Sequence, residues 1–175
     1  MLTLSLLRHA KSAWDQDTLS DFERPLADRG RDAAPKMGRA INAAGLKPSH
    51  IYCSGAVRTR QTLALVLPEL APPPPTVTYD DGLYLCPPLT MLDRIHKMPA
   101  TDTHILFVGH NPCHHILAVE LANAGDPEAL RLAANKFPTC GLAVLTFKTN
   151  DWRDVTPGTG TLTHFITPRG LSKSA

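Results

Sequence analysis

Two apolar runs in this chain are each followed at once by residues that could do chemistry. The run Leu2–Leu7 ends abruptly at Arg8 and His9. The run Thr103–Gly109 is followed directly by His110. Apolar runs of this length are typical of buried strands in a parallel sheet, and in open α/β sheets ligands bind beyond the carboxyl ends of the strands. We therefore expect Arg8, His9 and His110 to lie at one edge of a sheet.

A second arginine lies between these runs, in the segment Ser54–Thr62. Arg58 stands near the start of a helix predicted at Ala56–Leu67, so the positive end of that helix would add to its charge. Guanidinium groups match phosphate oxygens in shape and charge. A neutral imidazole attacks phosphorus without a separate base. These residue types predict a pocket for a phosphoryl group with one histidine as nucleophile, although a histidine alone at a strand end is more often structural.

Length, composition and charge place the chain among ordinary folded proteins. It has 175 residues, 43% hydrophobic and 19% charged, which predicts one domain with a full core. The net charge of +2 argues against nucleic acid as a partner. The first apolar run is too short to span a membrane. The cysteines are widely spaced without a Cys-x-x-Cys pair, so we expect reduced thiols and a cytoplasmic protein. They are Cys53, Cys86, Cys113 and Cys140.

Strand-like and helix-like segments alternate, which predicts an α/β fold with a largely parallel sheet covered on both faces. Strands are predicted at Leu2–Leu7, His50–Cys53, Val77–Tyr79, His104–Val108, Leu142–Phe147 and Leu162–Ile166. Helices are predicted at Asp28–Ala44, Ala56–Leu67, Leu89–Met98 and Pro112–Ala124, with Gly125 ending the last. We expect the last two strands to form a hairpin at one edge of the sheet.

The sequence also predicts the limits of the domain and contains one proline-rich segment. One domain is expected over residues 1–167, followed by a flexible tail at 168–175. The run Pro72–Pro75 is interpreted as a stiff connection; the alternative is a polyproline segment that docks a partner.

Four motifs, in order along nearly the whole chain, give it a resemblance to a known family. The chain resembles the histidine phosphatase superfamily (the phosphoglycerate mutase-like clan), and most of all its SixA-like phosphohistidine phosphatase branch. The matching pieces are Leu7-Arg8-His9-Ala10, Arg24-Pro25-Leu26 with Gly30, Ser54 with Arg58 and Thr62, and Val108-Gly109-His110-Asn111-Pro112. The resemblance implies a single three-layer α/β/α domain around a mostly parallel six-stranded sheet.

The resemblance also implies the roles of the central residues. His9 would be the nucleophile, while Arg8, Arg58 and His110 would hold the phosphoryl group, and neither a metal ion nor a cofactor would be needed. Because a non-catalytic phosphate-binding regulatory domain would not need His9, the pair of histidines favours an enzyme.

Further residues are candidates for lining the pocket. Arg24 would contact substrate or would only anchor its loop to Asp21. Lys11 and Ser12 follow the nucleophile directly and would contact substrate; Ser54 would do so too or would cap the helix at Ala56–Leu67.

A grouping of histidines and the acidic residues between Arg58 and His110 suggest two further roles, a metal site and a general acid. The grouping His110, His114 and His115 is a weak indication of a metal site, because Pro112 places the helix start after His110 and no carboxylate stands at a ligand spacing. Relatives that cleave phosphate esters carry an acid between the second arginine and the second histidine. None of the acidic residues in that interval lies in a segment that resembles the acid motif of those relatives. Asp81, after the third strand, is the best placed of them as a possible general acid.

A site with a poor or absent acid suits phosphoramidates, whose imidazole leaving group needs little protonation help. The sequence therefore favours a phosphatase that acts on phosphohistidine of a protein. The alternatives are a phosphomonoesterase for a small phosphorylated metabolite and a non-catalytic phosphate-binding domain.

Overall fold

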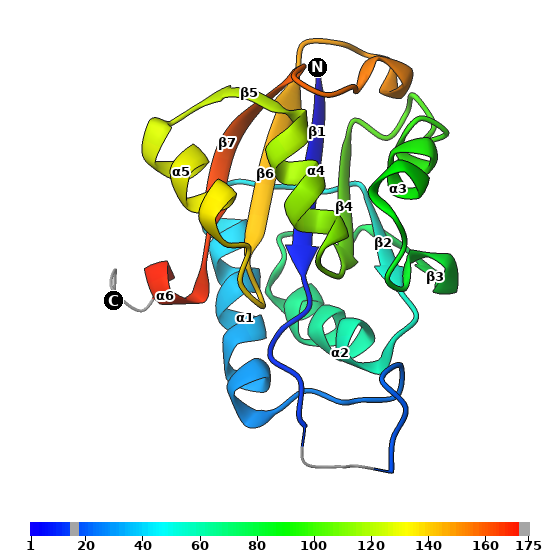
Figure 1. The fold of residues 1–175 in the computed structure, drawn as a ribbon, viewed down its shortest axis with the longest axis vertical. Helices are drawn as coiled ribbons and strands as arrows, with labels where there is room; N and C mark the ends of the chain where they lie inside the picture. The colour runs from blue at the N-terminus through cyan, green and yellow to red at the C-terminus, as the bar shows by residue number, and fades with distance from the viewer. Residues whose placement is uncertain (15–17, 172–175) are drawn as a thin grey trace.

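Seven strands and six helices alternate along the part of the chain that the computed structural model describes, residues 1–14 and 18–171 (Figure 1). In chain order they are β1 (Leu2–Arg8), α1 (Asp28–Ala43), β2 (His50–Ser54), α2 (Val57–Val66), β3 (Thr76–Asp80), α3 (Pro88–Ile95), β4 (His104–Gly109), α4 (Cys113–Leu121), β5 (Ala122–Gly125), α5 (Pro127–Asn135), β6 (Leu142–Phe147), β7 (Gly160–Ile166) and α6 (Pro168–Leu171). Three short 3₁₀ turns lie at Leu67–Glu69, Asp81–Leu83 and Trp152–Asp154.

The strands form one sheet in the order β3-β2-β4-β1-β6-β7-β5. The neighbouring strands β3, β2, β4 and β1 are all parallel, whereas β6 is antiparallel to both β1 and β7. Arg8 at the end of β1 lies in register with Gly109 at the end of β4, and Cys53 of β2 lies in register with Val108. The strands that precede the candidate residues therefore end level with one another at one edge of the sheet.

Helices cover both faces of the sheet and bury two apolar clusters. Helices α3, α4 and α5 pack on one face, where α4 crosses in front of the strands in Figure 1. Helices α1 and α2 pack on the other face. Strand β1 lies between them and is buried on both faces, as its largely apolar sequence predicts. The expected three-layer α/β/α domain, with a mostly parallel sheet, is confirmed.

The sheet has one strand more than the sequence indicated. The helix expected to reach Ala124 ends at Leu121, and the next four residues form β5, parallel to β7 at the edge of the sheet. Gly125 does not end a helix. Its φ of 149° suits glycine, and a Cβ there would lie 2.6 Å from the carbonyl oxygen of Leu162. The expected hairpin of β6 and β7 is present, but β5 and not β7 forms the edge.

Helices α5 and α6 differ from what the sequence predicted. Helix α5 was not predicted, although Asp126 caps it by accepting a hydrogen bond from the Ala129 amide at 2.9 Å and Pro127 occupies its first turn. Of the tail expected at 168–175, the first four residues form α6, whose Leu171 packs on the cluster beside α1. Residues 172–175 lie outside the described part.

Candidate active site

The two histidines meet at the level edge formed by β1, β4 and β2. His9 directly follows β1 and His110 directly follows β4. Their ring centroids lie 5.3 Å apart. The amide of His9 donates to the carbonyl of Gly109 at 3.0 Å, which extends the β1–β4 pairing to the nucleophile candidate itself. The sheet thus fixes the backbone of both histidines.

Helix α2 is joined to this edge through Thr62. The Thr62 hydroxyl accepts a hydrogen bond from the Ala10 amide at 2.9 Å and donates to the carbonyl of Arg58 at 2.7 Å. Arg58 is the second residue of α2. The buried hydroxyl of Thr62 therefore links Ala10, which follows His9, to Arg58.

Two guanidinium groups lie inside the site. Arg58 is buried, and its Nη2 atom approaches His110 Nδ1 at 3.4 Å. Arg8 donates from Nη1 to the carbonyl of Phe137 at 2.8 Å. The Nε atoms of both arginines are buried without a hydrogen-bond partner in the described part of the chain. Since unpaired buried donors are costly, these two N–H groups are suited to donating hydrogen bonds to phosphoryl oxygens.

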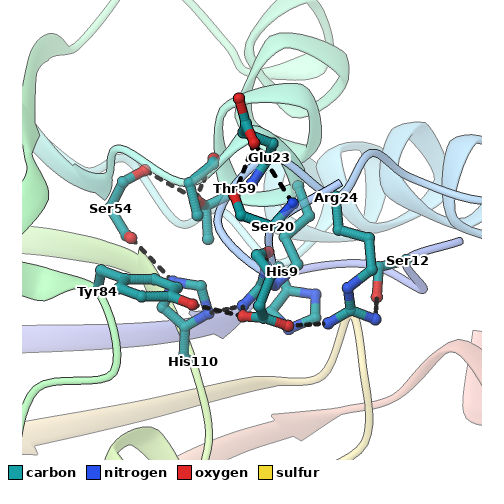
Figure 2. Close-up of polar contacts among 12 residues, drawn as sticks. His9, Ser12, Ser20, Glu23, Arg24, Ser54, Thr59, Tyr84 and His110 are labelled. Carbon is teal, nitrogen blue, oxygen red and sulfur yellow. Dashed lines mark hydrogen bonds and ion pairs between the residues drawn. The ribbon is translucent and has the colours of Figure 1, made fainter. Parts of the chain in front are cut away.

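A third arginine and a tyrosine stand at the mouth of the site (Figure 2). Arg24 donates to Ser12 Oγ at 3.2 Å and to the Asp21 carboxylate. Tyr84 donates to the same carboxylate at 2.5 Å, and the edge of its ring faces His110 with centroids 5.3 Å apart. In Figure 2, Tyr84 and Arg24 lie on either side of His9. Of the two roles expected for Arg24, the anchor to Asp21 is observed.

His9 is held as a neutral imidazole with a defined tautomer. Its Nδ1 atom lies 2.7 Å from the carbonyl oxygen of Ala10. Because a carbonyl only accepts, Nδ1 carries the proton and Nε2 keeps a free lone pair. Burial, opposed by that hydrogen bond and reinforced by the charges of Arg58, Arg8 and Arg24, lowers the pKa of His9 to about 4. A free lone pair on Nε2 is what a nucleophile for phosphorus requires.

His110 is likewise neutral. Burial, together with the positive charge that His9 and Arg58 would add, lowers its pKa to about 2. Its Nδ1 atom faces an arginine donor, so Nε2 carries the proton and donates to Ser54 Oγ at 2.8 Å. The Ser54 hydroxyl therefore orients His110 (Figure 2).

The expected capping role of Ser54 is wrong. Helix α2 begins at Val57 after Ala56, with no side-chain hydrogen bond at its cap, because Ser54 still belongs to β2 and points its hydroxyl at His110. Ser12 is buried and reached by Arg24, whereas the exposed Lys11 side chain makes no recorded contact with the site among the described residues.

Asp81 lies beside the site and outside its hydrogen-bond network. It begins the 3₁₀ turn after β3 and is exposed. A Cβ atom on Gly55 would fall 1.7 Å from its Oδ1 atom, so the carboxylate lies against the backbone just beyond Ser54. Among the described residues it has no hydrogen bond to His9, Arg58 or His110.

Three residues have places in the site that the sequence did not predict. Asp21 had been considered only as an anchor for Arg24, yet it also contacts Arg58 at 2.9 Å and Tyr84. His114 is buried under the edge, where a Cβ on Gly109 would lie 2.8 Å from its Nε2 atom. Asp21 lies three residues before the Arg24-Pro25-Leu26 segment and could have been found there. Tyr84 carries no pattern of its own, and His114 was grouped only with His110 and His115 as a weak metal candidate.

Residues 1–14 and 18–171 contain neither a cluster of metal-ligand side chains nor a membrane-spanning helix. No group of three or more His, Cys, Asp or Glu side chains in these ranges is arranged to hold a metal ion. In the same ranges, no helix is both long and apolar enough to cross a bilayer.

The parallel sheet, with two histidines and two arginines gathered at its carboxyl edge, is the framework of an α/β phosphatase domain. A profile of the histidine phosphatase superfamily (branch 1) matches residues 4–84. An uncharacterized protein of Mycobacterium tuberculosis is 38% identical over 93% of this chain and 100% of its own length. An uncharacterized Mycobacterium leprae protein is 32% identical over the same shares. The chain belongs to the histidine phosphatase superfamily.

Solved structures agree with this assignment. A structure from Agrobacterium tumefaciens that carries the name of the phosphohistidine phosphatase SixA is 28% identical, with a TM-score of 0.77 over 95% of this chain and 98% of that chain. The protein histidine phosphatase SixA complexed with tungstate has the same fold, with a TM-score of 0.77 over 97% and 99% of the two chains at 23% identity. The chain is therefore SixA-like in fold, and its family indicates phosphatase activity.

Proposed function

We propose that this protein is a phosphohistidine phosphatase that passes the phosphoryl group through His9 to water without a metal ion. The observation that carries the proposal is that the carboxylate hydrogen-bonded within the described residues of the site is held in its ionised form. The one carboxylate hydrogen-bonded within it is Asp21. Burial alone would raise the pKa of Asp21, but hydrogen bonds from Tyr84 and Arg24 and the charge of Arg58 lower it to about 2.

A carboxylate with so low a pKa is ionised at neutral pH and cannot protonate a leaving group. An alkoxide leaving group depends on such a proton, whereas phosphohistidine can already be protonated on its second ring nitrogen at neutral pH and then needs no acid from the protein. The site is thus better matched to a P–N bond than to a phosphate ester. The resemblance in sequence and fold to proteins named as phosphohistidine phosphatases supports the same substrate class.

The chemistry has two steps. His9 Nε2 attacks phosphorus in a phosphohistidine whose second ring nitrogen is protonated from solvent. The P–N bond breaks with its electron pair on the departing nitrogen, so the substrate leaves as a neutral imidazole. Water then attacks phospho-His9, which releases inorganic phosphate and restores the neutral imidazole. The free Nε–H groups of Arg8 and Arg58 would bind the equatorial oxygens in both steps.

His110 would assist from its Nδ1 side. That atom already faces Arg58 Nη2 at 3.4 Å, where an oxygen held by Arg58 would meet it. Nδ1 donates only when protonated, and the negative charge of a bound phosphoryl group favours that protonation.

The test is phosphate release from a phosphohistidine peptide and from p-nitrophenyl phosphate, in EDTA. We expect release from the peptide by the native protein, a loss of at least about 1,000-fold in His9→Ala, and native rates in the control His164→Ala, whose histidine lies on β7 away from the site. Equal rates in the native protein and His9→Ala would exclude His9 as nucleophile. Loss of activity in EDTA would overturn metal independence.

The ester alternative rests on Asp81, whose exposed carboxylate lies against Gly55 beside the site. If the protein were a phosphomonoesterase, p-nitrophenyl phosphate and sugar phosphates would be the better substrates and Asp81→Asn would abolish their cleavage. Tight phosphate binding without turnover and without a phosphoenzyme would instead favour a binding domain.

A further inference from the structure

Asp21 stands where several donors of the site converge. Its carboxylate accepts hydrogen bonds from Arg24, from Arg58 Nη2 at 2.9 Å and from Tyr84 at 2.5 Å, and its backbone carbonyl accepts from Arg58 Nη1. The Arg58 side chain is only 3% exposed. A buried guanidinium requires a counter-charge, and the only ion pair of Arg58 among the described residues is with Asp21.

Two opposite consequences are conceivable for a carboxylate so placed. If it competed with the phosphoryl group for the arginines, its removal would tighten anion binding. Alternatively, it holds the arginines in the arrangement that a phosphoryl group needs, so that its removal would weaken anion binding.

The backbone around Asp21 decides between them because it is fixed from several sides. The Phe22 carbonyl accepts from the Val57 amide at 3.0 Å, which joins this segment to the first residue of α2. The Phe22 ring packs on the Tyr84 ring edge to face, with centroids 5.0 Å apart. A side chain anchored in this way is a support for Arg58 and not a group that swings out when an anion arrives.

The atoms of Arg58 agree with this view. Asp21 binds both terminal nitrogens, through its carbonyl oxygen and its carboxylate, and so fixes the plane of the guanidinium. The Nε–H group is left without a partner in the described structure. The site thus uses one edge of Arg58 for support and keeps the other donor for a ligand.

We propose that Asp21 is a positioning residue that orients Arg58 and Arg24 for the phosphoryl group, with Tyr84 fixing its carboxylate. This inference rests on the proposed function only in that the site binds a tetrahedral oxyanion. Asp21 does not touch the reacting atoms and transfers no proton.

The test compares Asp21→Asn with Glu23→Gln. Both changes remove one negative charge from the same exposed segment, but Glu23 is hydrogen-bonded only to Ser20 among the described residues. The measurements are the dissociation constant of orthovanadate by calorimetry, kcat and KM for a phosphohistidine peptide, and the midpoint of thermal unfolding.

We expect Asp21→Asn to weaken orthovanadate binding and lower kcat/KM by about 10- to 100-fold, because a misplaced guanidinium loses its alignment with the oxyanion. Glu23→Gln should stay within about twofold of the native protein. Tyr84→Phe should weaken vanadate binding less than Asp21→Asn, since it removes one donor to Asp21 and leaves the ion pairs. The unfolding midpoints separate these effects from loss of the fold.

Tighter or unchanged vanadate binding in Asp21→Asn would overturn the proposal. An equal weakening in Glu23→Gln would also overturn it, because the effect would then be one of net charge. If the native protein binds vanadate but does not release phosphate from phosphohistidine, the proposed function fails while the vanadate comparison still decides the role of Asp21.

Discussion

The imidazole rings of His9 and His110 lie 5.3 Å apart, centroid to centroid, with their planes tilted by 53°. Both rings are buried and both lie beside Arg58, so each is held in its neutral form. His9 Nδ1 donates a hydrogen bond to the carbonyl of Ala10, and His110 Nε2 donates one to the hydroxyl of Ser54. His9 therefore has a free lone pair on Nε2, while Nδ1 of His110 faces Arg58.

The low pKa of His9 sets the acid side of the pH profile. Because burial and nearby arginines lower that pKa to about 4, the nucleophile remains unprotonated well below the usual histidine range. We expect kcat/KM for a phosphohistidine peptide to stay within about threefold between pH 7.5 and pH 5.5, after correction for the stability of the substrate. An acid limb centred near pH 6.5 would show that His9 titrates as an ordinary histidine and would contradict this account.

The same buried histidines make the fold sensitive to mild acid. Burial lowers the pKa of His9 and His104 to about 4, of His114 to about 3 and of His110 to about 2. Between these values and about 6.5 the unfolded chain binds more protons than the folded chain, so stability falls as pH drops below about 6.5. We expect the thermal midpoint to be lower at pH 5 than at pH 7.5 by at least about 5 °C.

The carboxylates provide the check on that interpretation. Asp21 and Asp151, whose pKa values are lowered to about 2, lose their contribution only as pH falls below about 4. A midpoint that stays constant down to pH 4.5 would therefore mean that the histidines do not carry the effect. His114→Asn should reduce the slope between pH 7.5 and pH 5, whereas His164→Asn should leave it unchanged.

Ser54 is expected to matter through His110. Ser54→Ala removes the acceptor 2.8 Å from His110 Nε2 and leaves that buried N–H group unpaired. Loss of one such hydrogen bond costs about 1 kcal/mol, so kcat should fall about 5- to 10-fold. Ser20→Ala is the matched control, because Glu23 is the one hydrogen-bond partner of Ser20 among the described residues. Native kcat in Ser54→Ala would show that His110 needs no such support.

Gly30 ties the start of α1 to the segment after the nucleophile. A Cβ at this position would lie 2.2 Å from the carbonyl oxygen and 3.0 Å from the amide nitrogen of Lys11. Because the obstacle is backbone, Gly30→Ala should lower the free energy of unfolding by about 1–3 kcal/mol and reduce phosphatase activity more than tenfold. Gly170→Ala, whose Cβ would meet Thr167 Oγ1 at an ordinary contact distance of 3.5 Å among the described residues, is the control for urea denaturation. Equal stability of the two variants would mean that Lys11 moves freely.

Much of the fold could be predicted because its strands are apolar runs with clear ends. Six strands and four helices were expected, and β6 has the expected bounds of Leu142–Phe147. β5 could not be foreseen, since Ala122–Gly125 has no strand-like side chains and pairs only because β7 passes close to Gly125. Local propensity was overridden there by a tertiary contact.

By itself, the sequence determined which residue types stand at the strand ends. The order of Arg8, His9, Arg58 and His110, each beside a strong strand or helix signal, is a local property and was sufficient to indicate phosphoryl chemistry. Only the tertiary structure decided how these groups are oriented and charged. The tautomer of His9, the hydroxyl of Ser54 on His110 and the support of Arg58 by Asp21 depend on contacts between segments far apart in the chain, and burial sets the pKa of each histidine.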